Sequence, residues 1–402
     1  MDILEAKQVV IKAGHELLKA GLIVRTWGNI SCRVSDTQFV ITPSGRAYED
    51  LTPDDIVLVN IADCSYDGDV KPSSEKGIHA SCYQLRPDCN FVIHTHQANA
   101  SIVSALGYDI NSLTEEHSAI IGSDVPCAAY GLPGTGKLRQ GVIDSLNRSK
   151  SKAIILAHHG AVCVGSDYDD AFKVASTLED VCEKYIADRC SEVSGKAVET
   201  LSGVKDYIKS VFTSDASYKA QKEIAPIDSE RNGETITIFK DGAEVVKLNV
   251  NSGSAIGGGE KPESADLHLA IYKKREDVNF IHHSHNEYVK AISMQGKKMK
   301  PLLDDFAQLI GPTVKCAVFD NSSAKKVVKA LGNKNAVLLK DNGAICVAGT
   351  KYDAEAIEIV MDKGCKTLVG ANLYSGVKAI NAIEANLMRI IYKMKYSKKA
   401  GK

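Results

Sequence analysis

Two histidines, His94 and His96, stand two positions apart in the apolar run FVIHTH, residues 91–96. Side chains two apart on a β-strand share a face, so both imidazoles are expected to point the same way. Paired imidazoles on one face have the spacing of metal ligands. A buried core strand that contains two histidines would have the same sequence pattern. A metal site therefore requires further ligands elsewhere in the chain.

Two further segments offer donors of the right kind. KPSSE places Glu75 in or next to the first turn of a helical pattern, and AHHGA places His159 after an apolar run and before a glycine. Taken alone, these are a capped helix and an ordinary strand end. Together, Glu75, His94, His96 and His159 would form a four-coordinate site with the nitrogen and oxygen ligands that zinc prefers.

Short polar loops accompany these donors. Ser73 and Ser74 precede the helical pattern and suit an N-cap or, with exposed backbone N–H groups, an anion site. RTWGNIS (25–31) and ITPSGRAYE (41–49) have small side chains and a glycine, as a phosphate-binding loop requires. Each could equally be an ordinary turn, so none identifies a ligand alone.

One glycine-rich stretch is expected to be unrelated to nucleotides. GLPGTGKL (131–138) contains GxxxxGK, but Leu138 stands where a nucleotide-binding loop has Ser or Thr for magnesium. No acidic partner strand is evident. The stretch is therefore expected to be a turn that leads into the helix LRQGVIDSL.

The length, charge and cysteine content of the chain limit which kinds of protein it can be. At 402 residues two domains are expected, and 49 basic against 50 acidic residues leave no global field for nucleic acid or an anionic membrane. The basic end, YKMKYSKKAGK, is expected to be a frayed, solvated tail. Eleven scattered cysteines without a CxxC pair, and no apolar stretch of membrane-spanning length, favour a cytoplasmic protein that is not membrane-bound.

The chain repeats itself. NFVIHTH (90–96) returns as NFIHHSH (279–285), and three other segments return in the same order: SLTEEHSAIIG as PLLDDFAQLIG, AIILAHHGAVCVG as AVLLKDNGAICVAG, and YDDAFKV as YDAEAIE. We therefore predict two homologous lobes, 1–195 and 231–395. The linker, 196–230, holds a possible helix at KDYIKSVF. Both lobes mix β-branched runs with helical patterns, which is typical of an α/β protein.

Taken together, TWGNIS, TPSG, KPSSE, HTH and HHG, in this order and spacing, resemble the class II aldolase and adducin family. The resemblance covers 5–190 almost end to end and, more faintly, 232–390. It implies two tandem three-layer α/β/α domains, each with a central, mostly antiparallel mixed sheet. It implies one zinc ion per chain, or cobalt or manganese with the same donors, bound by Glu75, His94, His96 and His159. His158, one residue earlier, is expected to face the other way and to be structural.

The same resemblance implies a phosphorylated sugar as substrate. Its phosphate would be held by loops at these positions: Thr26, Asn29, Ser44, Gly45, Ser73 and Ser74. The implied reaction is cleavage or formation of a carbon–carbon bond in a ketose phosphate through an enediolate stabilised by the metal, with Glu75 moving the proton.

One position departs from the family's pattern. Where its aldolases supply a tyrosine from a neighbouring subunit, this chain has Glu115 or Glu116, which are the expected second acid/base groups. That change leaves a sugar-phosphate epimerase, dehydratase or decarboxylase as alternatives. A non-catalytic, adducin-like assembly module is a third possibility.

The second lobe is expected to be degenerate. It keeps His283 and His285, but Asp341-Asn342 replaces the HH pair of the first lobe. Opposite Glu75 it has Ser264 or Ala265. Replacement ligands exist in Glu263, Asp266 and Asp341, although loss of the site is the favoured interpretation.

The family's four-membered rings imply a use for a second lobe. A tandem chain supplies two ring positions, so a homodimer that forms a pseudo-tetrameric ring is expected. In such a ring, Asp304 and Asp305, which align with Glu115 and Glu116, could serve the zinc site of an adjacent active lobe.

Overall fold

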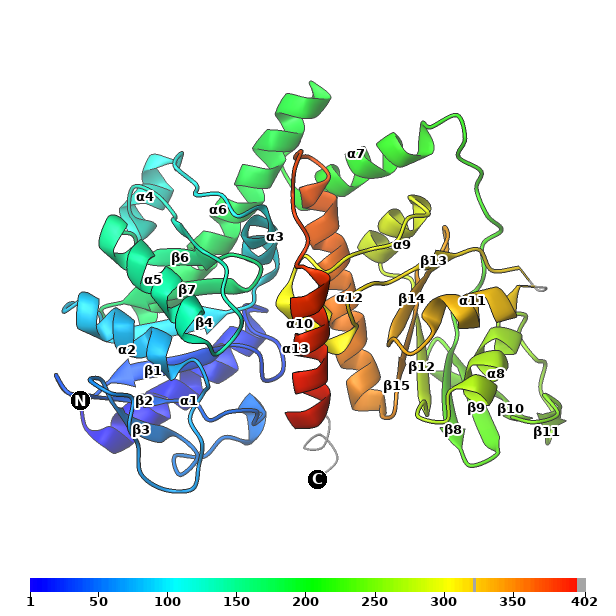
Figure 1. Ribbon diagram of the computed structural model, residues 1–402, viewed down its shortest axis with the longest axis horizontal. Helices are drawn as coiled ribbons and strands as arrows, with labels where there is room; N and C mark the ends of the chain where they lie inside the picture. The colour runs from blue at the N-terminus through cyan, green and yellow to red at the C-terminus, as the bar shows by residue number, and fades with distance from the viewer. Residues whose placement is uncertain (321–322, 396–402) are drawn as a thin grey trace. The chain divides into compact units, whose positions relative to one another are not determined.

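The structure is a computed structural model that describes residues 1–320 and 323–395, and the chain forms two compact units (Figure 1). The first unit is Met1–Leu201 with Leu373–Lys378. The second is Ser202–Asn372 together with the described residues from Ala379 onward. Within the described part no helix is long and apolar enough to cross a membrane. From residue 396 the basic tail lies outside the described residues, whereas its first four residues belong to the last helix.

The first unit is built on a seven-stranded sheet with the order β3-β2-β1-β4-β7-β6-β5. The strands are β1 (Asn29–Arg33), β2 (Gln38–Ile41), β3 (Val57–Asn60), β4 (Phe91–Thr95), β5 (Cys127–Ala128), β6 (Ala153–Leu156) and β7 (Gly160–Gly165). Neighbouring strands run antiparallel except β5 and β6, which are parallel. The predicted mostly antiparallel mixed sheet is therefore confirmed.

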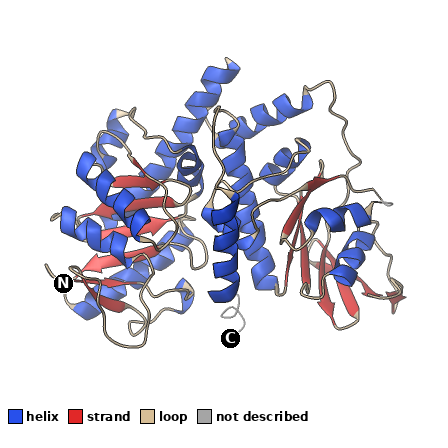
Figure 2. Ribbon diagram, in the orientation of Figure 1, coloured by secondary structure: helices blue, strands red, loops and turns tan. Residues whose placement is uncertain are grey.

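Helices cover both faces of this sheet (Figure 2). They are α1 (Ile3–Lys19), α2 (Lys76–Leu85), α3 (Ala98–Leu106), α4 (Glu115–Ile121), α5 (Gly136–Arg148) and α6 (Tyr168–Ser194). α2 and α5 pack together on one face, and α1, α3 and α6 lie on the other. Alternate apolar residues of the strands, such as Val92 and Val162, form a buried core with Ile78 and Leu138 of the first pair. This is the predicted three-layer α/β/α arrangement.

The second unit repeats this architecture with eight strands in the order β11-β10-β9-β8-β12-β15-β14-β13. Its strands are β8 (Asp228–Asn232), β9 (Thr235–Lys240), β10 (Ala243–Asn249), β11 (Ala255–Ile256), β12 (Phe280–Ser284), β13 (Cys316–Ala317), β14 (Ala336–Leu339) and β15 (Ala344–Ala348). The run β8-β12-β15-β14-β13 matches β1-β4-β7-β6-β5 in order and direction. The predicted tandem repeat is thus present in the fold.

The helices of the second unit follow the same plan. They are α7 (Leu201–Thr213), α8 (Ala265–Lys274), α9 (Glu287–Met294), α10 (Asp304–Leu309), α11 (Ala324–Leu331), α12 (Lys351–Ala371) and α13 (Ala382–Lys395). α8 packs on α11 as α2 does on α5, and α9 packs on α12 as α3 does on α6. The segment expected to link the lobes, 196–230, contains α7, which confirms the predicted helix at KDYIKSVF, and the start of β8.

The glycine-rich stretch GLPGTGKL is a turn before a helix, as predicted. Helix α5 starts at Gly136, and the hydroxyl of its N-cap, Thr135, accepts a hydrogen bond from the Leu138 N–H. The N-cap prediction for α2 was wrong by one or two residues. The N-cap of α2 is Glu75, and Ser73 Oγ accepts from the Glu75 N–H at 3.2 Å.

A tight hairpin turn recurs in both units. His158, between β6 and β7, has φ +61°, and Asp341, between β14 and β15, has φ +65°. Each is followed two residues later by a glycine that lies against the preceding central strand. A Cβ on Gly160 would come within 2.2 Å of the Thr95 carbonyl oxygen, and one on Gly343 within 2.0 Å of that of Ser284. The close approach of two backbones therefore requires glycine at both positions.

Gly160→Ala is expected to lower the free energy of unfolding of the first unit by about 2 kcal/mol or more, because the methyl group would collide with a backbone carbonyl that cannot move without disturbing β4. Gly136→Ala is the matched control, since a Cβ there meets nothing within 4 Å. Thermal and urea unfolding of both variants measure the difference. Equal stability of the two variants would contradict the close approach.

Candidate metal centre

Strand β4 positions the first histidine. His94 pairs with Asn29 of β1 on one side and with Val162 of β7 on the other, and its side chain is fully buried. Its ring Nδ1 lies 2.8 Å from the Ala161 carbonyl oxygen, which can only accept a hydrogen bond. Nδ1 therefore carries a proton, and Nε2 is the ring atom that can bind a metal.

The other two histidines converge on the same point. His96 follows the end of β4, and its Nε2 is 3.1 Å from His94 Nε2. His159 lies in the hairpin turn before β7, with its ring stacked on that of His94 at a centroid distance of 4.9 Å and 4.6 Å from the ring of His96. One ligand atom from each of the three side chains lies within 4.8 Å of the others.

Glu75 faces this group from the N-terminus of α2. Its Oε2 is 3.2 Å from His94 Nε2 and its Oε1 is 3.0 Å from His159 Nε2, while only 8 % of its surface is exposed. Burial alone would raise the pKa of Glu75, but His159 and His94 hold it well below its usual value. The carboxyl group is therefore ionised at neutral pH.

The spacing of these donors fits a single ion. Ligand atoms about 2.0–2.1 Å from one tetrahedral centre lie about 3.3–3.4 Å apart. The nearest contacts here, between the carboxylate and the imidazoles and between two imidazoles, are 3.0 to 3.2 Å. Across residues 1–320 and 323–395, the group His94, His96 and His159 is the one cluster of three or more His, Cys, Asp or Glu side chains that could hold a metal.

The neighbouring His158 is not part of this group, but not for the predicted reason. It was expected on a strand, facing away; it lies instead in the hairpin turn in a left-handed conformation. Its ring packs edge-on against Tyr130 at 5.3 Å. The turn, not strand alternation, separates the two adjacent imidazoles.

Two of the predicted phosphate loops lie side by side. The Ser44 N–H donates to the Lys71 carbonyl at 2.9 Å, and the Ser73 N–H donates to that of Thr42 at 3.1 Å. Gly45 follows in a left-handed conformation at φ +72°. This pairing places both loops next to the N-terminus of α2.

The remaining predicted phosphate residues occupy three different settings. Ser74 is exposed and lines a cavity of about 240 Å³ with residues at the starts of α2 and α5. Thr26 is half-buried in the loop before β1. The Asn29 side chain is engaged elsewhere: its Nδ2 donates to Glu75 Oε2 at 3.1 Å, and its Oδ1 is 2.5 Å from His79 Nε2.

Glu115 and Glu116 are exposed in the first turn of α4. No contact recorded for the described residues joins them to the histidines. Their predicted role concerns the site of a neighbouring copy, so it remains a prediction.

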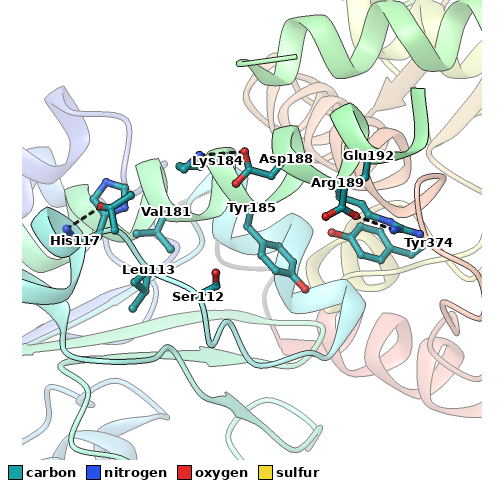
Figure 3. Close-up of a pocket in the computed structure, with 11 residues that line it drawn as sticks. Ser112, Leu113, His117, Val181, Lys184, Tyr185, Asp188, Arg189, Glu192 and Tyr374 are labelled. Atoms are coloured by element: carbon teal, nitrogen blue, oxygen red, sulfur yellow. Dashed lines mark hydrogen bonds and ion pairs between the residues drawn. The ribbon is translucent and has the colours of Figure 1, made fainter. Parts of the chain in front are cut away.

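A separate cavity of about 350 Å³ lies between the start of α4 and α6 in the first unit (Figure 3). None of the four proposed metal ligands lines it. Its charged side chains pair with one another, Lys184 with Asp188 at 3.0 Å and Arg189 with Glu192 at 2.9 Å. Tyr374 lies under the Arg189 guanidinium at 5.5 Å. In each pair the two charges are opposite, so these side chains need no charged ligand to balance them.

In the second unit the equivalent positions hold other residues. His283 and His285 keep their mutual approach, with Nε2 atoms 3.2 Å apart. Ser264 is the N-cap of α8, as Glu75 is the N-cap of α2. Ser264, and not Ala265, is therefore the counterpart of Glu75. Asn342 takes the place of His159 in the hairpin turn.

That turn binds the end of the preceding linker. Asn342 donates to the Lys222 carbonyl at 2.9 Å and accepts from the Ile224 N–H at 2.8 Å. Asp341 accepts from the Tyr218 hydroxyl at 3.0 Å and from the Gln221 N–H at 2.8 Å. The side chains that replace the HH pair thus hold segment 218–224 in place.

The possible replacement ligands are engaged in other contacts. Glu263 pairs with Lys222 at 2.9 Å, and Asp266 pairs with Lys261 at 2.5 Å. Asp341 is held by the linker, as described above. None of the three belongs to a metal-ligand group among the described residues.

The role considered for Asp304 and Asp305 stays a prediction, and the burial of both side chains speaks against it. These side chains are 0 % and 4 % exposed, and Asp305 forms a buried ion pair with Lys363 of α12. Helix α10, which carries them, packs against α12 and α13 of its own unit. The alignment of Asp304 and Asp305 with the exposed Glu115 and Glu116 did not reveal this burial.

A buried polar chain behind Glu75 was not anticipated. His79 and Tyr83 of α2 and Ser31 of β1 connect through Asn29 to the Glu75 carboxylate. The signal was present in the sequence as Glu-x₃-His-x₃-Tyr on one helix and Asn-x-Ser on one strand, spacings that put each set on one face. The network was missed because neither the helix nor the strand, taken alone, shows that these polar side chains meet.

The chain is also similar to known proteins in sequence and fold. The family model for the class II aldolase and adducin N-terminal domain matches 8–186 and again 237–369. A 5-methylthioribulose-1-phosphate/5-deoxyribulose-1-phosphate aldolase from Escherichia coli is 34% identical over 187 residues, 46% of this chain and 85% of that protein. An L-fuculose phosphate aldolase of the same species is 34% identical over 177 residues, 44% of this chain and 80% of its own length.

A solved L-fuculose 1-phosphate aldolase matches 48% of this chain and 90% of its own at 28% identity and a TM-score of 0.44. The two segments matched by the family model together cover most of the chain, and each falls on one repeat of the fold. The chain therefore belongs to the class II aldolase and adducin family, as a tandem pair of its domains.

Proposed function

We propose that this protein is a zinc-dependent aldolase that cleaves or forms a carbon–carbon bond in a ketose phosphate. The observation that carries the proposal is the convergence of Glu75 and three imidazoles, two of them buried, on one point, beside paired loops at a helix N-terminus. The two relatives from Escherichia coli are named as aldolases of ketose phosphates. Cleavage of such a substrate between C3 and C4 gives dihydroxyacetone phosphate and an aldehyde.

Glu75, His94, His96 and His159 would hold the ion in the first unit, one per chain. When bound, zinc supplies Lewis acidity to the carbonyl oxygen of the substrate, where negative charge develops as the bond breaks. Cobalt or manganese suits the same donors. Glu75 is ionised and lies beside these imidazoles, so it can accept the proton that moves at the reacting carbon and return it.

The loops next to α2 would hold the phosphate. Ser44 and Gly45 lie beside Ser73, and Ser74 lies at the start of the helix, where the positive end of the helix dipole favours an anion. Thr26 would close the site from the loop before β1. Together they would fix the substrate relative to Glu75.

Glu115 or Glu116 would act as a second acid/base in the site of a neighbouring copy. Their exposure at the start of α4 supports this role, because a group that serves another subunit has to reach the surface. The assembly that follows is a homodimer of tandem chains with a pseudo-tetrameric ring. The second unit would take part without a metal of its own.

The purified, zinc-loaded protein is expected to release dihydroxyacetone phosphate and a short aldehyde from L-fuculose 1-phosphate or 5-deoxyribulose 1-phosphate. A coupled glycerol-phosphate dehydrogenase assay measures the triose phosphate. Glu75→Gln is expected to lower kcat by at least about 100-fold, because the amide cannot accept the proton. An epimerised or dehydrated product that keeps all carbons of the substrate would refute the aldolase assignment in favour of one of the alternative reactions.

His159→Asn gives the first unit the residue that the second has in its hairpin turn, and it is expected to weaken zinc binding by more than about 100-fold, because a direct ligand is lost. His158→Asn is the matched control. Asn tolerates the left-handed conformation of that position, so zinc affinity and turnover should stay within about threefold of the wild-type values. Chelator competition measures both affinities, and equal losses in the two variants would show that His159 is not a ligand.

A further inference from the structure

A continuous chain of hydrogen bonds runs from the core of the first unit to the Glu75 carboxylate. The Tyr83 hydroxyl is 2.7 Å from Ser31 Oγ, and Ser31 Oγ is 2.6 Å from His79 Nδ1. His79 Nε2 is 2.5 Å from Asn29 Oδ1, and Asn29 Nδ2 is 3.1 Å from Glu75 Oε2. Each of these side chains is at most 8 % exposed.

Two elements hold the five residues in line. Glu75, His79 and Tyr83 are four residues apart at the N-cap and along one face of α2. Asn29 and Ser31 are two apart on β1, and so they share the face of the sheet that α2 covers. The packing of one helix on one strand therefore sets every distance in the chain.

The direction of the hydrogen bonds follows from the Asn29 amide. Its Nδ2 donates to Glu75 Oε2, and its Oδ1, which can only accept, faces His79 Nε2. His79 Nε2 therefore carries a proton. Burial lowers the pKa of His79 to about 3, so the ring is neutral and its Nδ1 accepts. Ser31 then donates to Nδ1 and accepts from Tyr83, and every link donates towards Glu75.

The second unit retains only the inner half of this chain. Ser229 Oγ lies 2.7 Å from His268 Nδ1 and 2.9 Å from the Tyr272 hydroxyl, which repeats the contacts of Ser31. Two residues before Ser229, Ile227 stands just ahead of β8 in the position of Asn29, and Ser264 stands in that of Glu75. Among the described residues no hydrogen-bond partner reaches His268 Nε2.

The comparison of the two units shows which part of the chain of hydrogen bonds is common to the fold and which part accompanies the histidine group. The Ser–His–Tyr half occurs in both units, so it serves the contact between helix and strand. The Asn–Glu half occurs only in the unit with the histidine group. A buried polar side chain at Asn29 is stabilising only where a partner accepts its hydrogen bond, and the second unit has a buried isoleucine there.

We infer that Asn29, His79 and Ser31 are positioning residues that orient the Glu75 carboxylate for the metal. Ser31 fixes the tautomer of His79, His79 fixes the orientation of the Asn29 amide, and Asn29 holds Glu75 Oε2 by donating a hydrogen bond. Without the Ser31 hydroxyl, the His79 proton can move to Nδ1. Asn29 then turns, and its amide oxygen opposes the carboxylate. The inference rests on the proposed metal role of Glu75.

Matched variants in the two units test it. Ser31→Ala and Ser229→Ala remove the same hydroxyl from the same network, so both should lower the Tm by similar amounts. Zinc affinity, measured on the metal-free full chain by chelator competition without substrate, should fall by about 10-fold in Ser31→Ala and by up to about 100-fold in Asn29→Ala. Ser229→Ala should bind zinc like the wild type.

A second pair of variants and an NMR measurement separate a loss of the hydrogen-bond network from misfolding. Tyr83→Phe and Tyr272→Phe keep the buried rings and remove one donor each, and only Tyr83→Phe should weaken zinc binding, by a few-fold. In protein labelled with ¹⁵N-histidine, the His79 resonances should show a protonated Nε2 in the wild type and a mixture of tautomers in Ser31→Ala.

The outcomes distinguish this inference from the proposed function. Unchanged zinc affinity in both Ser31→Ala and Asn29→Ala would overturn the positioning role while leaving an active aldolase intact. A wild-type protein that binds zinc but cleaves no ketose phosphate would refute the aldolase and leave the positioning role supported by the affinity differences. No zinc uptake by the wild type would overturn both.

Discussion

The structure of the first unit depends on one unfavourable arrangement, an ionised carboxylate buried against three imidazoles. Removing Glu75 from water disfavours its charged form, and only close partners offset that cost. His94 and His159 are the close partners of the carboxylate on one side, and the Asn29 amide is its partner on the other. The register of β1 on β4, the hairpin turn before β7 and the start of α2 have to be correct together, because each delivers one of these partners.

The second unit shows the same frame without that constraint. The sheet order, the left-handed turn residue and the glycine against the central strand are all retained. In place of a carboxylate and a third imidazole it has Ser264 and an asparagine, and the linker segment is bonded to the turn. The second unit thus adopts the same sheet order and hairpin turn without the carboxylate and the third imidazole.

Much of this could be predicted from the sequence, for identifiable physical reasons. The period of two in FVIHTH put His94 and His96 on one face, and the repeated segments revealed two lobes before any coordinates. The setting of His158 was missed because a left-handed turn has no signature in the HHG letters. The burial of Asp304 and Asp305 was missed because it depends on the packing of α10 against α12 and α13, which the aligned segments do not show. The chain behind Glu75 joins residues about fifty positions apart, whose contacts only the fold supplies.

The central claim is that one metal ion binds between Glu75 and the histidine group of the first unit. The most direct test is the number of metal ions per chain in protein purified without added metal or chelator, measured by elemental mass spectrometry together with zinc titration. The account predicts about one zinc ion per chain, lost in His159→Asn and retained in the second-unit variant His283→Asn. Two ions per chain would show that the second unit also binds metal, and no uptake even on titration would contradict the metal centre itself.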